Sequence, residues 1–320
     1  MIVHFILHGE TLESISEEIK LENPKYLKEY HNKLCAREDY IQDELIPRKK
    51  LLIPELKDIN EYNAKNDAPF KHPKLNPILS FDPENFSKIF DVNITEATEN
   101  EDKKKSNFIS FTASLKWVKK DSDDHIFHLF KNNFYDQAGS KMADLATESI
   151  RSLNPIVIKT NSRGKVINIS LKKETIDNFK SIKEKLLDFF PDKYAKIYID
   201  ECEMAVLDQK IFNERMKYDS FIKTYFASVR NEFVNGKSYI EQTIGEENIP
   251  IRIQQKVGEE NHAQEIDILQ TFQSPDQNID YDGKYTFFSE NGLIKNIEIR
   301  YIIFQSEIKN MTSLKIHEKS

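Results

Sequence analysis

The chain has 320 residues, which exceeds the roughly 100 to 200 residues of one ordinary domain and predicts at least one small and one larger folded unit. Hydrophobic residues make up 39% and charged residues 31% of the sequence, a balance that supplies a packed core and excludes wholesale disorder. The formal net charge of -7 argues against broad electrostatic attraction to nucleic acid or to an anionic membrane.

The first residues, from Met1 to Leu7, are apolar except for His4, and the chain turns polar at His8. This start lacks the basic leader and the longer apolar stretch of a signal peptide, and no later segment has the about 20 apolar residues of a membrane span. We therefore expect a cytoplasmic protein with no signal peptide and no membrane span. The only cysteines, Cys35 and Cys202, fall in different predicted domains, so no disulfide framework is expected.

Strand and helix signals alternate over the first 54 residues. The run from Val3 to Leu7 predicts a strand, and Thr11 is placed to cap a helix whose apolar face carries Ile15 and Ile19. A second helix is expected after Pro24, and its apolar residues are Tyr26, Leu27 and Tyr30. A final apolar run ends at Ile53 and Pro54.

This pattern resembles the LysM family. Gly9-Glu10-Thr11-Leu12 resembles the family's Gly-Asp-Thr-Leu, and Asn32 stands where the family usually has Asn. The ending, Asp43-Glu44-Leu45-Ile46-Pro47-Arg48-Lys49-Lys50-Leu51-Leu52-Ile53-Pro54, resembles the consensus Asp-x-Leu-x-Pro-Gly-Gln-x-Leu-x-Ile-Pro. The resemblance implies that residues 1–56 form a βααβ LysM module, a non-catalytic binding domain.

Many LysM modules bind N-acetylglucosamine polymers in a shallow groove between the first strand–helix loop and the loop before the final strand. The resemblance places the ligand-binding groove at Gly9, Glu10, Thr11, Leu12, Asn32 and Ile53. Two departures point away from a sugar. Arg48 replaces the turn glycine, which a positive φ disfavours, and the segment 33–42 is longer than usual and charged.

Residues 57–104 are predicted to form a connector. Six of the eleven prolines fall between Pro47 and Pro83, and a polar tract follows from Asp91 to Lys105. Proline removes backbone donors and dense charge leaves little to bury, so a proline-rich and then charged linker is expected. A short apolar cluster in it is expected to dock onto a neighbouring domain; its members are Phe81, Phe86, Ile89 and Phe90.

Residues 105–320 predict an α+β domain of unrecognised family, with a curved antiparallel sheet and two long helices. Strand patterns occur at 108–117, 155–160, 165–171, 239–244, 249–257, 265–272, 284–289 and 293–305. Turns are expected at 161–164, at Asp282-Gly283 and at Asn291-Gly292. Helical spacing covers 176–190, closed by Pro191, and about 193–233, with a break near 217–220.

Candidate chemistry is sparse. His125 and His128 lie in an expected strand, where positions three apart face opposite sides and cannot share a metal. Acidic residues at Asp200, Glu201, Glu203 and Asp208 fit a solvated helix face better than a catalytic carboxylate pair. Nucleophile-elbow, phosphate-loop, dinucleotide and Cys-x-x-Cys motifs are missing. The sequence therefore predicts no catalytic residues, no metal site and no cofactor.

Two functions follow from the resemblance. LysM-like folds occur in baseplate, hub and spike-adaptor proteins of phage tails and type VI secretion, where they hold protein. We expect a non-enzymatic adaptor whose module docks onto a spike, hub or baseplate protein of a contractile injection or type VI secretion apparatus, with the C-terminal domain binding an effector or partner. The alternative is a cell-wall protein that binds peptidoglycan, and a third possibility is an enzyme that LysM targets to the wall.

Overall fold

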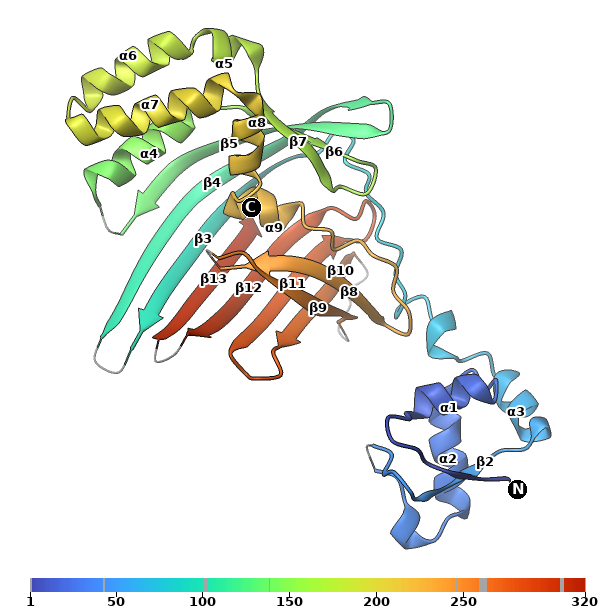
Figure 1. Ribbon diagram of the computed structural model, residues 1–320. Helices are drawn as coiled ribbons and strands as arrows, with labels where there is room; N and C mark the ends of the chain where they lie inside the picture. The colour runs from blue at the N-terminus through green and yellow to red at the C-terminus, as the bar shows by residue number, and fades with distance from the viewer. Residues whose placement is uncertain are drawn as a thin grey trace. The chain divides into compact units, whose positions relative to one another are not determined.

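The computed structural model describes residues 2–42, 44–100, 103–137, 139–245, 247–258, 264–305 and 308–319. The chain divides into two compact units, shown in Figure 1. Unit 1 comprises Met1–Pro77 and Phe233–Lys237, and unit 2 comprises Ile78–Glu232 and Ser238–Ser320.

Unit 1 opens with the expected β-α-α-β segment. Its elements are β1 (Ile2–Phe5), α1 (Leu12–Glu18), α2 (Pro24–Leu34), the short 3-10 helix η1 (Arg37–Asp39) and β2 (Lys50–Ile53). β1 and β2 pair antiparallel, with Ile2 opposite Ile53 and Phe5 opposite Lys50. The predicted order of elements is thus confirmed.

Local residues fix the starts of both helices. Thr11 caps α1: its Oγ1 accepts from the Ser14 amide at 3.1 Å, and its own amide donates to Ser14 Oγ at 2.9 Å. Asn23 caps α2, accepting from the Lys25 amide at 3.1 Å just ahead of Pro24. The core between the helices and strands consists of Ile6, Ile15, Leu21, Tyr26, Leu27, Ile41, Leu51, Ile53 and Ile59.

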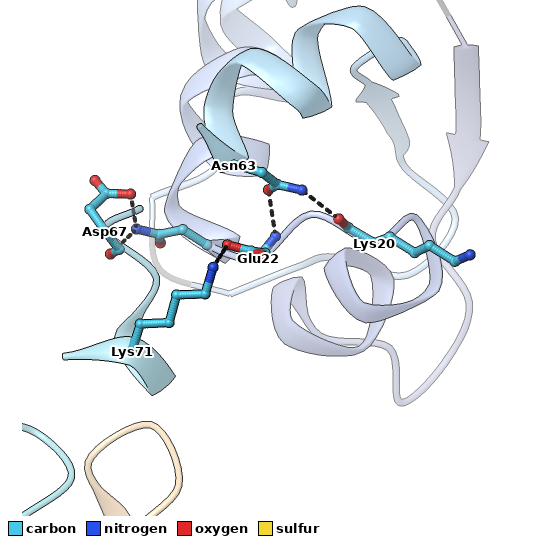
Figure 2. A network of polar contacts seen from close by, with 6 residues as sticks. Lys20, Glu22, Asn63, Asp67 and Lys71 are labelled. Atoms are coloured by element: carbon cyan, nitrogen blue, oxygen red, sulfur yellow. Dashed lines mark hydrogen bonds and ion pairs between the residues drawn. The ribbon is translucent and has the colours of Figure 1, made fainter. Parts of the chain in front are cut away.

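Unit 1 continues past residue 56, where the sequence predicts the module to end. The helix α3 (Leu56–Asn63) adds Ile59 to the core, and Tyr62 stacks on Tyr26 with ring centroids 4.7 Å apart. Figure 2 shows the polar side of this attachment: Asn63 Oδ1 accepts from the Glu22 amide at 2.9 Å, and Asn63 Nδ2 donates to the Lys20 carbonyl at 3.0 Å. The start of the expected connector is therefore folded structure.

The same network continues into the short 3-10 helix η2 (Pro69–Lys71). Lys71 Nζ forms an ion pair with Glu22 at 2.7 Å, and Asn23 Nδ2 donates to the Asp67 carbonyl at 3.0 Å (Figure 2). These bonds join residues more than forty positions apart to the α1–α2 loop. Segment 56–71 is thus held by the helices that it follows.

Unit 2 is built on one broad antiparallel sheet. Over the described residues its eleven strands run in the order β7-β6-β5-β4-β3-β13-β12-β11-β10-β9-β8. Their bounds are β3 Ser87–Glu99, β4 Lys104–Asp121, β5 Asp124–Asp136, β6 Ile156–Thr160, β7 Val166–Leu171, β8 Lys237–Ile244, β9 Ile249–Val257, β10 Glu265–Gln273, β11 Ile279–Phe288, β12 Ile294–Gln305 and β13 Ile308–Glu318. The sheet is strongly curved, as predicted (Figure 1).

One face of this sheet is buried and carries the core of the unit. Cross-strand partners lie on the same face, and the register aligns Leu171, Ile156 and Leu129, all buried, across β7, β6 and β5. Further along the sheet, Val92, Ile316 and Ile297 continue the buried surface across β3, β13 and β12. Side chains at alternating positions face the other way and are more exposed.

The helices of unit 2 are shorter than the two long helices predicted. They are α4 (Lys141–Ser152), α5 (Lys173–Asp177), α6 (Phe179–Phe189), α7 (Lys193–Leu207), α8 (Gln209–Met216) and α9 (Ser220–Tyr225). The predicted helix 193–233 breaks where an aspartate caps a new helix. Asp208 accepts from the Lys210 amide at 2.9 Å, and Asp219 accepts from the Ile222 amide at 3.1 Å.

Strand β3 corrects the predicted connector over 57–104. Ser87–Glu99 pairs with β4 on one side and β13 on the other, in the middle of the sheet. The polar tract misleads because it alternates: Phe90 and Val92 are fully buried, whereas the charged and polar residues between them face away. Gly283 is likewise inside β11, opposite Gln270, and not in a turn as predicted.

Side chains from α8 protect the edge of the sheet. The amides of Ile169 and Leu171 on the edge strand β7 donate to Asn213 Oδ1 at 2.8 Å and to Gln209 Oε1 at 3.1 Å. An unpaired edge would offer these amides to another strand. The helix therefore replaces the missing neighbour.

A buried arginine binds the turn between β11 and β12. Arg230 donates from Nε at 3.1 Å and from Nη2 at 2.9 Å to the Gly292 carbonyl, and its guanidinium carbon lies 4.7 Å from the centroid of the Phe81 ring. Gly292 has φ +64, and a Cβ there would lie 1.9 Å from the Ser80 carbonyl oxygen. The turn between β11 and β12 thus tolerates no side chain.

We predict that Gly292→Ala destabilises unit 2 by about 2 to 4 kcal/mol, from left-handed strain plus overpacking against backbone. The control Gly139→Ala, at φ +57 with nothing within 4 Å of the added Cβ, loses about 1 kcal/mol through strain alone. Urea unfolding followed by the fluorescence of Trp117, the single tryptophan, measures both. Equal losses in the two variants would contradict the packing at Gly292.

Candidate functional site

The first candidate site is the corner between β1 and α1, where four of the six predicted groove residues adjoin. Gly9 has φ +89 and no atom within 4 Å of a Cβ built on it, so the corner is open at this point. Glu10 Oε2 accepts from the Leu7 amide at 2.7 Å and lies 2.8 Å from His4 Nε2. The bond with His4 is the largest cause of the lowered pKa of Glu10, and the Leu7 amide adds to it.

Thr11 and Leu12 also have internal partners. The Thr11 hydroxyl serves the capping box of α1, and Leu12 packs against the core of unit 1. Sugar recognition draws on free donors and acceptors, and in this corner the polar side chains of Glu10 and Thr11 are already engaged. The corner therefore offers a ligand mainly the backbone around Gly9.

Asn32 and Ile53, the other two predicted groove residues, hold the far side of the module. Asn32 Oδ1 accepts from the Ile41 amide at 2.9 Å, and its Nδ2 donates to the Ile41 carbonyl at 2.9 Å. The side chain thus clamps the lengthened loop that follows α2. Ile53 is buried in the core, opposite Ile2.

The turn before β2 has the conformation anticipated from the sequence. Arg48 adopts φ +72, and its amide donates to the Ile6 carbonyl at 2.8 Å. A residue with a Cβ is strained in this region. Asp43, the first residue of the matching segment, lies outside the described residues.

A second feature of unit 1 went unnoticed in the sequence: an exposed apolar row on β1 and the residues after it. Val3, Phe5 and Leu7 are 44%, 58% and 62% exposed, while Ile6 between them is buried. Leu52 and Lys50 lie opposite Val3 and Phe5 on β2. We call the face formed by Val3, Phe5 and Leu7 the strand face. The signal was the apolar run from Ile2 to Leu7, which only His4 interrupts, since a strand with one buried face needs apolar residues only at alternate positions.

Apolar and basic groups border the strand face. Ile46 is 56% exposed and precedes the turn in which Arg48 and Lys49 bond to Ile6. Arg48 and Lys50 are exposed beside it. An exposed apolar patch with a polar rim is typical of a protein-docking surface.

The candidate histidines of unit 2 make structural contacts. His125 is buried in β5, where its Nδ1 accepts from Trp117 Nε1 at 3.3 Å, and burial lowers its pKa. The strand alternation places His128 on the opposite face, as predicted. Among the residues that the structure describes, no group of three or more His, Cys, Asp or Glu side chains is placed to hold a metal ion.

The acidic residues on α7 join two helices. Lys183 of α6 pairs with Asp200 at 2.7 Å and with Glu203 at 2.6 Å, and these bonds raise its pKa. Asp208 caps α8. Cys35 and Cys202 are both free thiols. Within the described ranges, no helix has the length and apolar character to cross a membrane.

Comparison with known proteins yields distant structural neighbours. No protein-family model and no curated protein sequence matches the chain. Lipovitellin aligns at 10% identity with a TM-score of 0.38 over 73% of this chain, which spans 25% of the lipovitellin chain. A DUF1329 family protein from Desulfovibrio piger aligns at 9% identity with a TM-score of 0.21, over 73% of this chain and 87% of that one.

A third neighbour is DynF from the dynemicin biosynthesis pathway of Micromonospora chersina. It aligns at 4% identity with a TM-score of 0.18, over 72% of this chain and 79% of its own. TM-scores of this size do not establish a common fold, and identities this low transfer no function.

We predict that Asn32→Ala weakens unit 1 by about 1 to 2 kcal/mol, because it removes two hydrogen bonds to the backbone of Ile41. Hydrogen exchange of the Ile41 amide in the full chain measures the loss, and the exposed Asn60→Ala serves as control. Unchanged exchange at Ile41 would show that Asn32 does not hold the loop.

We further predict that Arg48→Gly stabilises unit 1 by about 1 kcal/mol, because glycine removes the strain of positive φ. Slower hydrogen exchange at Leu51 and Ile53 of β2 reports the gain. As a control, Lys50→Gly places glycine inside the strand and accelerates exchange there. A loss of stability in Arg48→Gly would contradict the strained turn.

Proposed function

We propose that this protein is a non-enzymatic adaptor whose N-terminal LysM-like module docks onto a protein. The partner is a spike, hub or baseplate protein of a contractile injection or type VI secretion apparatus, and unit 2 binds an effector or another partner. The protein acts in the cytoplasm during assembly. The exposed apolar strand face of Val3, Phe5 and Leu7 is the observation that carries the proposal.

The internal hydrogen bonds of the groove residues favour protein over glycan as the ligand. Glu10 bonds to His4 and Leu7, Thr11 caps a helix, and Asn32 clamps a loop. A sugar would have to displace these bonds to be read by the same side chains, and each lost bond opposes binding. A protein that covers the apolar side chains of the strand face does not have to displace these hydrogen bonds.

The charged residues beside the strand face indicate the chemistry of the partner's surface. Arg48 and Lys50 border the strand face on its β2 side, so a complementary surface presents apolar side chains flanked by carboxylates. Burying Phe5 and Leu7 against such a surface supplies the affinity, because each side chain contributes about 1.5 to 3 kcal/mol when fully covered. The opposite charges on the two surfaces orient the partner as it approaches.

A second candidate, peptidoglycan binding, is supported by one observation. The corner at Gly9 keeps the open, glycine-dependent backbone that the LysM resemblance implies for a sugar groove. In this alternative the backbone around Gly9, together with Leu12, contacts the glycan. Sedimentation of the full chain with purified sacculi separates this alternative from the first.

We predict that the double variant Phe5→Ser with Leu7→Ser lowers recovery of the spike, hub or baseplate protein at least about tenfold in affinity purification from native cells. Phe70→Ser removes a 47% exposed ring of the same unit and serves as the matched control, with recovery unchanged. The wild-type chain remains in solution when purified sacculi are sedimented.

Two results would overturn the adaptor proposal. The first is purification that recovers none of these proteins. The second is sedimentation with sacculi that N-acetylglucosamine oligomers prevent and that the double variant retains, which would establish the glycan alternative.

A further inference from the structure

The buried face of the large sheet is not filled completely. A cavity of about 690 Å³ lies against β3, β13, β12 and β11. Its floor is one continuous row, because Glu96 pairs with Thr312, Thr312 with Tyr301, and Tyr301 with Tyr281. Residues of α9 and of the β8–β9 turn line its other side. These strands and α9 are labelled in Figure 1.

The lining of this cavity mixes apolar and polar side chains. Its branched aliphatic residues come from five strands: Ile94, Ile244, Ile249, Ile299, Ile303 and Leu314. Cavities of several hundred Å³ in which polar groups converge beside apolar surface are typical of small-molecule sites. The size of the cavity and its aliphatic residues fit a ligand that has both a polar and a hydrocarbon part.

A second cavity of about 450 Å³ adjoins the first around α9. The two share Tyr218, Lys223, Gln242 and Thr243 as lining residues. The second cavity is further lined by Ile169, Ile222, Phe226 and Ile240. Lys223 therefore lies where the mixed first cavity meets the more apolar second cavity.

Lys223 lacks the ion pairs that hold Lys131 and Lys183. Lys131 is paired with Asp219, and Lys183 is paired with two carboxylates. Lys223 is half-buried and has no ion pair or hydrogen bond with any residue that the structure describes. Burial without a counter-charge lowers its pKa. A cation held in this way favours an incoming anion.

Gln242 supplies a second polar group at the same place. Its Oε1 is buried with no hydrogen-bond partner among the described residues. Exchanging the amide oxygen and nitrogen, which a half-turn of the side chain accomplishes, directs an N–H donor at the site instead. An anion at Lys223 is thereby given one charged and one neutral donor.

The cavity also contains carboxylates. Glu96 and Glu247 line it and are exposed. Water screens exposed charges more strongly than half-buried ones, so their repulsion of an anion is weaker than the attraction of Lys223 at short range. The charge distribution therefore directs an anionic head group to the Lys223 side.

We propose that unit 2 binds a single-chain amphipathic anion, with its carboxylate or phosphate head at Lys223 and Gln242 and its hydrocarbon chain along the isoleucine-lined cavity. The ammonium donates to the head group, and the chain gains by leaving water. This site is separate from the docking of unit 1 and does not depend on it.

The test is calorimetric titration of the full chain with submicellar dodecanoate, dodecyl phosphate and the neutral control dodecanol. We expect at least one of the two anions to bind about tenfold or more tightly than dodecanol, because a hydrogen bond to a charged group supplies that difference. The stronger of the two identifies the head group. No binding by either anion, or equal binding of all three compounds, overturns the proposal.

Variants locate the site. Lys223→Met is expected to lower the affinity for the preferred anion about tenfold and to leave dodecanol unchanged, since it removes the charge and keeps the length. Lys210→Met, at an exposed lysine of α8, is the control and leaves the affinity unchanged. Thr312→Phe fills the floor and weakens binding of all three compounds. Anion affinity equal to wild type in Lys223→Met overturns the assignment.

The stability of Lys223→Met can be measured before its binding. Lys223→Met removes an unpaired, half-buried charge, so its thermal midpoint should equal or exceed that of the wild type. Weakened anion binding in a variant of undiminished stability then reports on the site itself. Weakened binding of dodecanol by the same variant would indicate a collapsed cavity and overturn the head-group assignment.

Discussion

The wide, one-sided sheet sets the main physical constraint on unit 2. Eleven strands, counted over the described residues, present a curved apolar face that the same chain has to cover. The segment around α9 covers part of it. Phe221 and Tyr225 stack with ring centroids 5.3 Å apart, and Tyr225 lies 5.2 Å from Phe90 on β3. The Tyr225 hydroxyl donates to the Ile294 carbonyl at 3.2 Å, so the helix is bonded as well as packed. Ser220, Lys223 and Thr224 of the same helix line the first cavity.

Buried polar groups decide where this covering segment lies. Asp219 pairs with Lys131 of β5 and also caps α9, so one carboxylate sets both the start of the helix and its position on the sheet. Breaking such a buried pair costs about 3 to 5 kcal/mol, because it leaves a charge without a partner. Arg230 satisfies its charge differently, with the Gly292 carbonyl and two aromatic rings. Lys223, by contrast, has no ion pair with any residue that the structure describes, and a half-buried charge without a counter-charge is a candidate for a functional site.

The sequence predicted elements whose signals are local. The hairpin of β6 and β7 follows from the turn at 161–164, and the βααβ order follows from caps and apolar spacing. Strand β3 was missed because eight of its thirteen residues are polar. The cavity could not be predicted, since Ile94, Lys223 and Ile303 meet only after the sheet is assembled. The strand face was missed for the opposite reason: a run with apolar residues at nearly every position does not show which side of the strand is covered. The sequence predicted which residues would form the groove. The structure shows the contacts that these residues make within unit 1.

Unit 1 owes its exposed strand face to its small size. Two short strands cannot cover both of their faces, and α1, α2 and α3 pack on one side, which leaves Phe5 and Leu7 exposed on the other. The proposed adaptor function therefore requires that a protein covers the strand face in the cell. The most direct measurement is photo-crosslinking in native cells with benzoylphenylalanine placed at Phe5 and, in a parallel strain, at Phe70. The account predicts a covalent adduct with a spike, hub or baseplate protein from position 5 and none from position 70. Adducts with peptidoglycan fragments, or no adduct from position 5, would contradict it.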